Sequence, residues 1–522
     1  MDLKTSLVYQ IAKLRLRRIE EYSSRLEDLQ QEQLRHILTR AARTDFGRRH
    51  GLSRSSTYAS YREAVPIIDY EGAKADIERM VQGERDVLIP GACRWFAKSS
   101  GTTSDRSKYI PVPYLHLQDC HYRGGSDALW LYLRNYPDSR FFSTKGLVLG
   151  GSHSPMPLSG GKAQTGDLSS ILVEHMPLLG NLLRVPSRET LLMSEWTAKM
   201  KAIVEEVKDA RVGSLSGVPS WMLVLLKEIL SATGRDNISE VWPDLEVFFH
   251  GGISFSPYRS TYAELIPSER MRYEETYNAS EGFFAIQDDP AESGMLLMLD
   301  YGVFYEFIPM DEFPSSSSDY SGVRARGIHE VELGRDYALV ISTLGGLYRY
   351  ILGDTVRFTS LYPHRIVITG RTKHFINAFG EEVMVANADG ALAEACRRDG
   401  KARVSEYTAA PCFFLDEGKG RHDWLIEFET EPRDLATFSR DLDDALRQLN
   451  SDYDAKRYED MTLLPLSVEV APEGLFHRWL EAEGKLGGQH KVPRLANSRH
   501  YLDALLRLSD LGHLDESFTP PT

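Results

Sequence analysis

The chain has few cysteines and no long apolar segment. Its 522 residues include four widely separated cysteines, in no CxxC pair or zinc-type spacing: Cys93, Cys120, Cys396 and Cys412. We expect reduced thiols of the kind found in the cytosol. No segment approaches the roughly 18–20 apolar residues of a membrane-spanning helix, and the opening residues lack the apolar core of a signal peptide. The sequence therefore predicts a cytoplasmic protein with no membrane partner.

Positive charge is not in excess either. The chain carries 61 Lys and Arg against 75 Asp and Glu, a formal net charge of −14. Because nucleic-acid binding relies on clustered positive charge, this balance argues against a nucleic-acid partner. It does not exclude a small anionic substrate, since the local potential of a cleft can oppose the net charge. With 42% hydrophobic and 26% charged residues, the chain has the composition of a globular protein, and its length corresponds to roughly two to four domains.

The first residues show a periodic apolar pattern. The apolar residues that recur every three or four positions are Leu3, Leu7, Ile11 and Leu14. This spacing predicts an amphipathic helix. Its basic residues leave two interpretations, packing onto the body of the protein or contact with a membrane surface. Acidic residues follow closely from Glu20 onward, so we expect the helix to pack onto the body of the protein.

Changes in composition divide the chain. Residues 294–370 consist of β-branched and aromatic runs separated by Gly, Asp and Pro, which predicts a β-rich subdomain. Beyond Arg371, helical and strand-like stretches alternate, as in an α/β or α+β domain. We therefore predict an N-terminal domain of residues 1–370 and a C-terminal domain of residues 371–522.

The clearest individual elements are helices over residues 71–80, 115–132, 384–398 and 435–449, and strands over residues 147–151, 245–252, 423–430 and 463–470. Residues 189–232 are predicted to be largely helical, with an interruption over 213–219. The tail after Gly512 is predicted to be disordered.

The first candidate site is a run of small hydroxyl residues and glycine, Ser99-Ser100-Gly101-Thr102-Thr103, followed by Lys108. Glycine lets a backbone approach an anion closely, and hydroxyl and N–H groups donate to it. A lysine nearby adds a point charge of the kind that contacts phosphate. The string is not a Walker A loop, since GxxxxGK[ST] is absent from the chain. It predicts an anion cradle, with a plain Ser/Thr linker as the alternative.

Two further motifs contain a carboxylate. Glu281 lies in the string YNASEG at residues 277–282, and one or two carboxylates of this kind hold Mg²⁺ beside substrate phosphates. Asp354 follows an apolar strand and a glycine in YRYILGD at residues 348–354, where a carboxylate can accept hydrogen bonds from ribose hydroxyls. The alternatives are a surface glutamate for the first motif and an ordinary turn aspartate for the second.

Two later segments supply positive charge. The string GRTK at residues 370–373 lies at the predicted domain boundary, where a hinge can bring different side chains to one site. Residues 484–494 are glycine-rich and carry Lys485, Lys491 and Arg494, which predicts a loop able to reach an anion. A solvated charged loop is the alternative.

In this order the motifs resemble those of the adenylate-forming superfamily, to which firefly luciferase belongs. The resemblance is closest to the acyl acid amido synthetases of the auxin-responsive Gretchen Hagen family, in its bacterial branch. It rests on SSGTTSDRSKYIP (99–111), YNASEG (277–282), GLYRYILGDTVRF (346–358) and QHKVPR (489–494), with AARTDFGRRHG (41–51) as a further match. It covers nearly the whole chain.

The resemblance implies an α/β fold with α+β elements. A large adenylation domain with β-sheets, helices and a β-barrel-like subdomain would precede a small mobile C-terminal domain. The string NAFGEEV (377–383) is typical of the bacterial branch, so the auxin and jasmonate of the plant enzymes are not carried over as substrates.

The resemblance also implies a ligase that forms carbon–nitrogen bonds in two steps. A small carboxylic acid reacts with ATP to give an acyl-adenylate and pyrophosphate, and an amine such as an amino acid then displaces AMP to give an amide. ATP and Mg²⁺ are the implied cofactors, and the acid and the amine are the implied partners of a monomer or weak dimer. An acyl-CoA ligase and a non-catalytic nucleotide- or ligand-binding relative remain alternatives.

The same resemblance gives roles to individual residues. Ser99, Ser100, Gly101, Thr102 and Thr103 would cradle the phosphates with Lys108, Glu281 would hold Mg²⁺, Tyr277 and Ser280 would flank the nucleotide, Gly251 and Gly252 would form the adenine-side turn, Asp354 would bind the ribose, Arg371 would contact ribose or phosphate, and Lys491 would stabilise the adenylation transition state. Tyr122 and Arg123 are candidates for the acid pocket, with a surface arginine as the alternative for Arg123. His374 is the one candidate base for the amide step.

Overall fold

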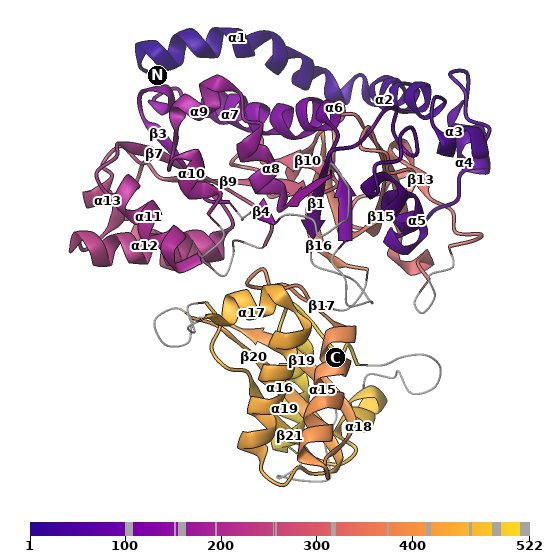
Figure 1. Cartoon of the computed structure of the whole chain (residues 1–522), viewed down its shortest axis with the longest axis vertical. Helices are drawn as coiled ribbons and strands as arrows, with labels where there is room; N and C mark the ends of the chain where they lie inside the picture. The colour runs from indigo at the N-terminus through magenta and orange to yellow at the C-terminus, as the bar shows by residue number, and fades with distance from the viewer. Residues whose placement is uncertain are drawn as a thin grey trace. The chain divides into compact units, whose positions relative to one another are not determined.

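The computed structural model of the chain describes residues 1–99, 108–150, 153–154, 163–193, 196–253, 255, 258–314, 320–372, 375–413, 419–458, 462–482 and 492–511. Two compact units are present (Figure 1). The N-terminal unit contains Met1–Ser99 and Lys108–Thr372, and the C-terminal unit begins at Lys373.

A mixed sheet of twelve strands forms the centre of the N-terminal unit, in the order β13-β12-β14-β15-β16-β11-β10-β9-β8-β7-β3-β6. The strands are β3 (Lys145–Val148), β6 (Arg184–Val185), β7 (Val212–Gly217), β8 (Val247–His250), β9 (Arg272–Ala279), β10 (Gly282–Ile286), β11 (Met295–Leu297), β12 (Val303–Pro309), β13 (Arg326–Gly327), β14 (Asp336–Thr343), β15 (Tyr350–Leu361) and β16 (His364–Arg371). The strands from β6 to β9 pair in parallel, and the strands from β9 to β13 pair in antiparallel fashion. β9 therefore joins a parallel half of the sheet to an antiparallel half.

The β-rich segment 294–370 supplies strands β11 to β16 of the antiparallel half. Strands β12 and β14 are buried over nearly their whole length. A strand buried on both faces carries a continuous apolar run instead of an alternating one. This burial explains the unbroken apolar strings by which the segment is recognised in the sequence.

A second sheet of the N-terminal unit has four strands in the order β2-β1-β5-β4. The strands are β1 (Trp95–Ser99), β2 (Lys108–Pro111), β4 (His153–Ser154) and β5 (Gln164–Gly166). β1 and β2 are the two arms of an antiparallel hairpin, in which Ser99 pairs with Lys108.

Helices cover these sheets (Figure 1). They are α1 (Leu3–Glu20), α2 (Leu26–Ala41), α3 (Asp45–Arg49), α4 (Tyr58–Ala64), α5 (Tyr70–Val81), α6 (Tyr114–His116), α7 (Arg123–Asn135), α8 (Leu168–Glu174), α9 (Leu178–Leu183), α10 (Arg188–Leu191), α11 (Trp196–Val207), α12 (Pro219–Thr233), α13 (Ile238–Val241) and α14 (Arg259–Leu265). α2 packs on β12 and β14, α7 packs on β10, and α1 packs on α7. A π-helical segment, Leu117–Tyr122, connects α6 to α7. Short 3-10 turns cover Glu21–Ser23, Phe141–Ser143, Met310–Glu312 and Ile328–Glu330.

The orientation of α1 differs from the expectation. The residues that α1 buries are Thr5, Ala12, Leu16 and Ile19. The apolar residues that were expected to pack onto the body of the protein are instead exposed: Leu3, Leu7, Ile11 and Leu14. The helix does pack onto the body of the protein, as expected, but it does so through its other face. No helix among the described residues is long and apolar enough to cross a membrane.

The C-terminal unit is built on a three-stranded sheet in the order β19-β20-β21. The strands of this sheet are β19 (Arg403–Cys412), β20 (Arg421–Thr430) and β21 (Ser467–Ala471). A separate two-stranded sheet consists of β17 (Phe375–Ile376) and β18 (Val383–Met384). The helices of the unit are α15 (Val385–Asp399), α16 (Leu435–Leu449), α17 (Ser451–Arg457), α18 (Leu475–Ala482) and α19 (His500–Leu511). Leu425 of β20 shares a core with α18 and α19, whereas Phe428 of the same strand meets Phe438 of α16. Residues three apart on a strand point to opposite faces, so helices cover both sides of this sheet.

Most of the predicted elements are confirmed. The helices over 71–80, 384–398 and 435–449 are α5, α15 and α16, and the strands over 245–252 and 423–430 are β8 and β20. The predicted interruption of the helical stretch over 213–219 is confirmed, and the residues that separate α11 from α12 form the parallel strand β7. The small residues of β7 permit close packing, since a Cβ on Gly213 would lie 2.1 Å from the Thr144 hydroxyl. All four cysteines are free. The tail after Gly512 lies outside the described residues.

Candidate active site

Asp354 is the centre of a buried polar cluster at the end of the large sheet. Gly353, immediately before it, has a φ of +99°, a conformation that favours glycine and bends β15. Asp354 pairs across the ladder with Arg371, the last residue of β16. Nε of Arg371 donates to Oδ1 of Asp354 at 2.7 Å, and the hydroxyl of Tyr277 on β9 donates to Oδ2 at 2.5 Å. Three strands therefore fix the orientation of one carboxylate.

Glu281 lies in the tight turn between β9 and β10. Ala279 pairs with Gly282, so Ser280 and Glu281 alone form the turn. Although it is a turn residue, Glu281 is only 8% exposed. The hydroxyl of Tyr350 lies 3.5 Å from its Oε1, and its backbone carbonyl is 3.0 Å from Nε2 of His116. The turn is thus held between β15 and the segment that follows β2.

The Glu281 carboxyl interacts electrostatically with the other charged groups of the site. Burial raises the pKa of the Glu281 carboxyl above its ordinary value, the positive charge of Lys108 works against this shift, and the negative charge of Asp354 adds to it. Lys108, the first residue of β2, lies over the ring of Tyr70, with Nζ 5.6 Å from the ring centre. The hydroxyl of Tyr70 accepts a hydrogen bond of 2.9 Å from the backbone N–H of Tyr109. The structure therefore brings together Lys108, Glu281, Asp354 and Arg371.

The hydroxyl-rich motif connects the two arms of the β1–β2 hairpin. Ser99 ends β1 opposite Lys108, while Ser100, Gly101, Thr102 and Thr103 lie outside the described residues, as do Lys491 and His374. The hairpin thus places Ser99, the first residue of the motif, beside Lys108.

Gly251 and Gly252 follow β8, next to the strand that carries Tyr277. A Cβ on Gly251 would lie 2.3 Å from the carbonyl oxygen of Thr276, and Gly252 has a φ of +84°. The hydroxyl of Thr276 donates to the carbonyl of His250 at 3.1 Å. Only glycine fits where these two backbone segments approach so closely. Because Thr276 precedes Tyr277, the Gly251–Gly252 turn lies on the Tyr277 side of the cluster.

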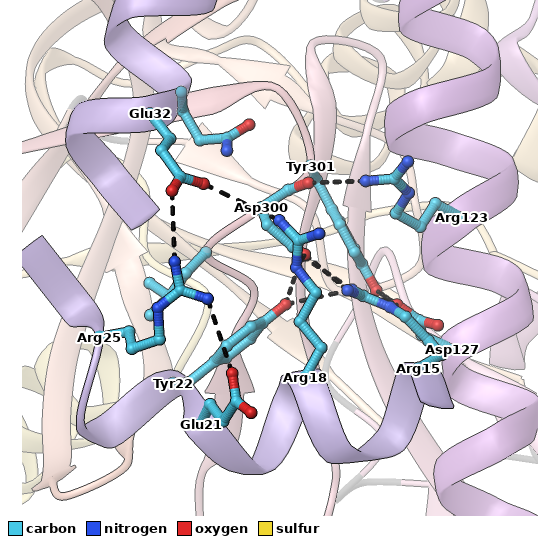
Figure 2. Close-up of polar contacts among 12 residues, drawn as sticks. Arg15, Arg18, Glu21, Tyr22, Arg25, Glu32, Arg123, Asp127, Asp300 and Tyr301 are labelled. Atoms are coloured by element: carbon cyan, nitrogen blue, oxygen red, sulfur yellow. Dashed lines mark hydrogen bonds and ion pairs between the residues drawn. The ribbon is translucent and has the colours of Figure 1, made fainter. Parts of the chain in front are cut away.

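Tyr122 and Arg123 are less close to the cluster. The Tyr122 hydroxyl donates to the carbonyl of Leu172 on α8 at 2.7 Å. The Arg123 guanidinium donates to the carbonyl of Asp300 at 3.0 Å and lies 3.4 Å from the Asp119 carboxylate. Arg123 thus belongs to a polar network under α1 (Figure 2), and no contact of its guanidinium with Glu281 or Asp354 is observed among the described residues.

Two buried histidines at the site are not identified from the sequence. The rings of His116 and His121 meet edge to face with their centres 5.2 Å apart, and Nδ1 of His121 lies 3.0 Å from Oδ1 of Asn278. Burial lowers the pKa of His116 to about 4 and that of His121 to about 3, so both rings are neutral at pH 7. Residues five apart diverge on an α-helix. The π-helical segment Leu117–Tyr122, which contains His121, has more residues per turn and brings the two histidines to one side. The sequence gives no signal for this π-helical segment.

A large mixed sheet followed by a separate α/β unit is the fold that this chain shares with adenylate-forming enzymes. The chain belongs to the GH3 family: models of the family's N-terminal, central and C-terminal domains match residues 15–271, 296–371 and 386–500. The predicted family, fold class and ligase activity are confirmed at this level.

Named relatives and solved structures agree with this assignment. Indole-3-acetic acid-amido synthetase GH3.3 of Arabidopsis thaliana is 24% identical over 97% of this chain and 94% of that protein. The 4-substituted benzoates-glutamate ligase GH3.12 of the same plant is 22% identical over 94% of this chain and 96% of that protein. AtGH3.15 acyl acid amido synthetase in complex with 2,4-DB superposes with a TM-score of 0.59 at 16% identity, covering 94% of this chain and 95% of that one. 2-Hydroxyisobutyryl-CoA ligase shares the fold, with a TM-score of 0.55 at 13% identity over 93% and 92%.

Proposed function

We propose that the chain is an ATP-dependent acyl acid amido synthetase that joins a small carboxylic acid to an amino acid. A carboxylate oxygen of the acid attacks the α-phosphorus of ATP, and the bond from the α-phosphorus to the oxygen bridging to the β-phosphate breaks. Pyrophosphate departs, and the product is an acyl-adenylate. The amine nitrogen then attacks the acyl carbon, loses a proton, and displaces AMP. The observation that carries the proposal is the joining of Glu281, Asp354, Arg371 and Lys108, from separate motifs, at one place in the fold.

In the first step a carboxylate approaches a triphosphate, and the site must offset the repulsion between them. Lys108 supplies positive charge at the base of the β1–β2 hairpin. The hydroxyl-rich motif that begins at Ser99 is suited to cradle phosphate oxygens, since its hydroxyl and backbone N–H groups can donate to them. We assign Lys108 to the phosphates and Ser99, Ser100, Gly101, Thr102 and Thr103 to the cradle.

Glu281 fits a Mg²⁺ ligand. It is a buried carboxylate beside a cation, and Mg²⁺ commonly takes only one or two carboxylates when substrate phosphates complete its shell. Among the described residues no group of three or more metal-binding side chains is found. When bound, Mg²⁺ would neutralise charge on the phosphate oxygens.

Asp354 is suited to hold the ribose. Each of its two oxygens already accepts one hydrogen bond, from Arg371 and from Tyr277. A carboxylate has about four acceptor positions, so two remain for ribose hydroxyls. We infer that Tyr277 orients Asp354 from beside the nucleotide, with Ser280, Gly251 and Gly252 on the same side.

For the second step we assign the C-terminal unit a mobile role. Lys491 would stabilise the adenylation transition state and then withdraw, so that the amine can enter. Tyr122 remains the candidate for the acid pocket, whereas the Arg123 guanidinium donates to the Asp300 carbonyl. The reaction belongs in the cytoplasm, where ATP, amino acids and reducing conditions are found together.

Acid-dependent exchange between ATP and pyrophosphate tests the first step, with a panel of apolar and aromatic acids. Exchange with at least one acid is expected, followed by amide formation when amino acids are supplied. A matched control is Asp336→Asn, which removes an exposed carboxylate paired with Arg357 across β14 and β15. Absence of exchange with every acid would contradict the proposal, and a CoA thioester without amide would assign the chain to the acyl-CoA ligases.

A further inference from the structure

Helix α1 exposes an apolar stripe. The four large side chains along this stripe are between 64% and 78% exposed: Leu3, Leu7, Ile11 and Leu14. At about 100° per residue, they lie on the side of the helix opposite to its buried residues. Single exposed leucines are normal on protein surfaces, but a continuous apolar stripe along one helix marks a contact surface.

A buried network prevents α1 from turning this stripe inward (Figure 2). Arg15 donates to both oxygens of Asp300, at 2.5 and 2.7 Å, and to Asp127 at 2.8 Å. Tyr22, just beyond α1, donates to Asp300 at 2.5 Å. The side chains of Asp127 and Asp300 are 2% and 1% exposed. Rotation of α1 would withdraw Arg15 and leave these buried carboxylates without that arginine, which is strongly unfavourable.

Basic residues outnumber acidic ones along α1, in which Glu20 is the one acidic residue. Within α1 the charged residues before Glu20 are Lys4, Lys13, Arg15, Arg17 and Arg18. Lys4, Lys13 and Arg17 are exposed. By helical position, Lys4 lies along one edge of the stripe, and Lys13 and Arg17 lie along the other. A chain with a net charge of −14 thus presents one face that is both apolar and basic.

These charges argue against a second copy of the chain as the occupant. A second copy would bring the same basic side chains, Lys4, Lys13 and Arg17, to this face a second time, whereas an anionic surface would neutralise them. Acidic Glu20 stands at the C-terminal end of α1, beyond the last residue of the stripe.

We propose that α1 docks on the surface of a bilayer that contains anionic lipids. Leu3, Leu7, Ile11 and Leu14 would enter the region between headgroups and acyl chains, and Lys4, Lys13 and Arg17 would contact the negatively charged headgroups. Binding is peripheral and reversible, because one short stripe buries little apolar area. It weakens with salt, because its charge component is screened.

Flotation of the full chain with lipid vesicles tests the proposal. Vesicles of phosphatidylcholine with phosphatidylglycerol should carry the chain, and vesicles of phosphatidylcholine alone should carry much less. The double variant Leu7→Gln/Ile11→Gln keeps good helix formers and should bind about ten-fold more weakly or worse, since each exchange removes a large apolar group from the lipid. The triple variant Lys4→Gln/Lys13→Gln/Arg17→Gln should bind anionic vesicles no better than neutral ones.

Leu333→Gln is the matched control, because Leu333 is 57% exposed on a segment far from α1 in sequence. It should bind as the unaltered chain does, and all variants should share its thermal unfolding midpoint. The proposal fails if the unaltered chain does not bind anionic vesicles, or if the α1 variants bind equally well. It also fails if light scattering finds a vesicle-free dimer that Leu7→Gln/Ile11→Gln dissociates, since a second copy would then be the occupant.

Discussion

Tyr350, the first residue of β15, directs its hydroxyl at the Glu281 carboxylate in the β9–β10 turn, 3.5 Å from Oε1. A second contact joins the same two segments, because Tyr277 of β9 donates to Asp354 of β15. β9 and β15 are not neighbours in the sheet, since β16, β11 and β10 lie between them. Two tyrosines therefore fix the separation of two buried carboxylates across three intervening strands. Substitutions of Tyr277, Glu281 or Asp354 therefore act on side chains that the large sheet holds in place.

Glu281→Gln should lower acid-dependent ATP–pyrophosphate exchange by about 10²- to 10³-fold, the usual cost of removing a charge stabiliser of the transition state. The amide keeps the size of the side chain and removes its charge, so the fold should be retained. Added Mg²⁺ should not restore exchange. Asp336→Asn, which removes the carboxylate that pairs with Arg357, is the control. Near-normal exchange in Glu281→Gln would exclude Glu281 as the metal ligand.

Lys108→Gln should shift the pH dependence of exchange. Burial raises the pKa of Glu281, and the charge of Lys108 opposes this shift. Loss of that charge should raise the pKa further, while Asp354 and Arg371 are unchanged. Because the ionised carboxylate is the active form, exchange is lost as the pH falls through this pKa, and the acid limb of the profile should move to higher pH. Lys108→Arg keeps the charge and should leave the limb in place. An unmoved limb in Lys108→Gln would show that the two groups do not interact.

Tyr277→Phe should raise KM for ATP about ten-fold, since it removes one hydrogen bond to a charged group. KM for the acid and the thermal unfolding midpoint should change little. This split distinguishes a positioning residue from a merely structural one. Asp354→Asn should affect the same parameter more strongly, because it alters the ribose ligand itself. Equal increases in both KM values would contradict the assignment of Tyr277 to the nucleotide.

The sequence predicts the order of the motifs, the family and most long elements, because these depend on local pattern. It does not predict which side chains join the motifs, since Tyr277 and Asp354 are 77 residues apart. Nor does it predict β7, whose glycine and serine residues favour a loop in isolation. In the fold, that lack of bulk is what lets Thr144 pack against Gly213.

The orientation of α1 shows the same limit of local pattern. The spacing of Leu3, Leu7 and Ile11 shows that these side chains share a face, but periodicity does not say where that face points. Arg15 decides the orientation through Asp300, which is 285 residues away in the sequence. A basic residue within an amphipathic helix looks like a solvated charge until its partner is known.

Asp300→Asn should lower the free energy of unfolding by about 3–5 kcal/mol, the usual cost of breaking a buried ion pair by removing one partner. The loss should depend on pH. Burial works to raise the pKa of Asp300, but hydrogen bonds from Arg15 and the charges around it hold that pKa below the ordinary value of 3.8. The stabilisation is therefore complete above that ordinary value, and it is lost as the pH falls through the lower pKa of the folded state. Thermal unfolding of both proteins at several pH values should show the difference shrinking only in strong acid.

Lys491→Ala should lower adenylation by about 10²- to 10³-fold while sparing the second step, because a cation that stabilises charge on the transferring phosphate has no role when the amine attacks the acyl carbon. Pyrophosphate exchange measures the first step. Single-turnover amide formation from a synthetic acyl-adenylate measures the second step without the first. Lys485→Ala, in the same glycine-rich segment, is the control for general loss of positive charge. If Lys491→Ala lowered both steps equally, Lys491 would act on the nucleotide throughout the cycle, and a C-terminal unit that withdraws between the steps would be contradicted.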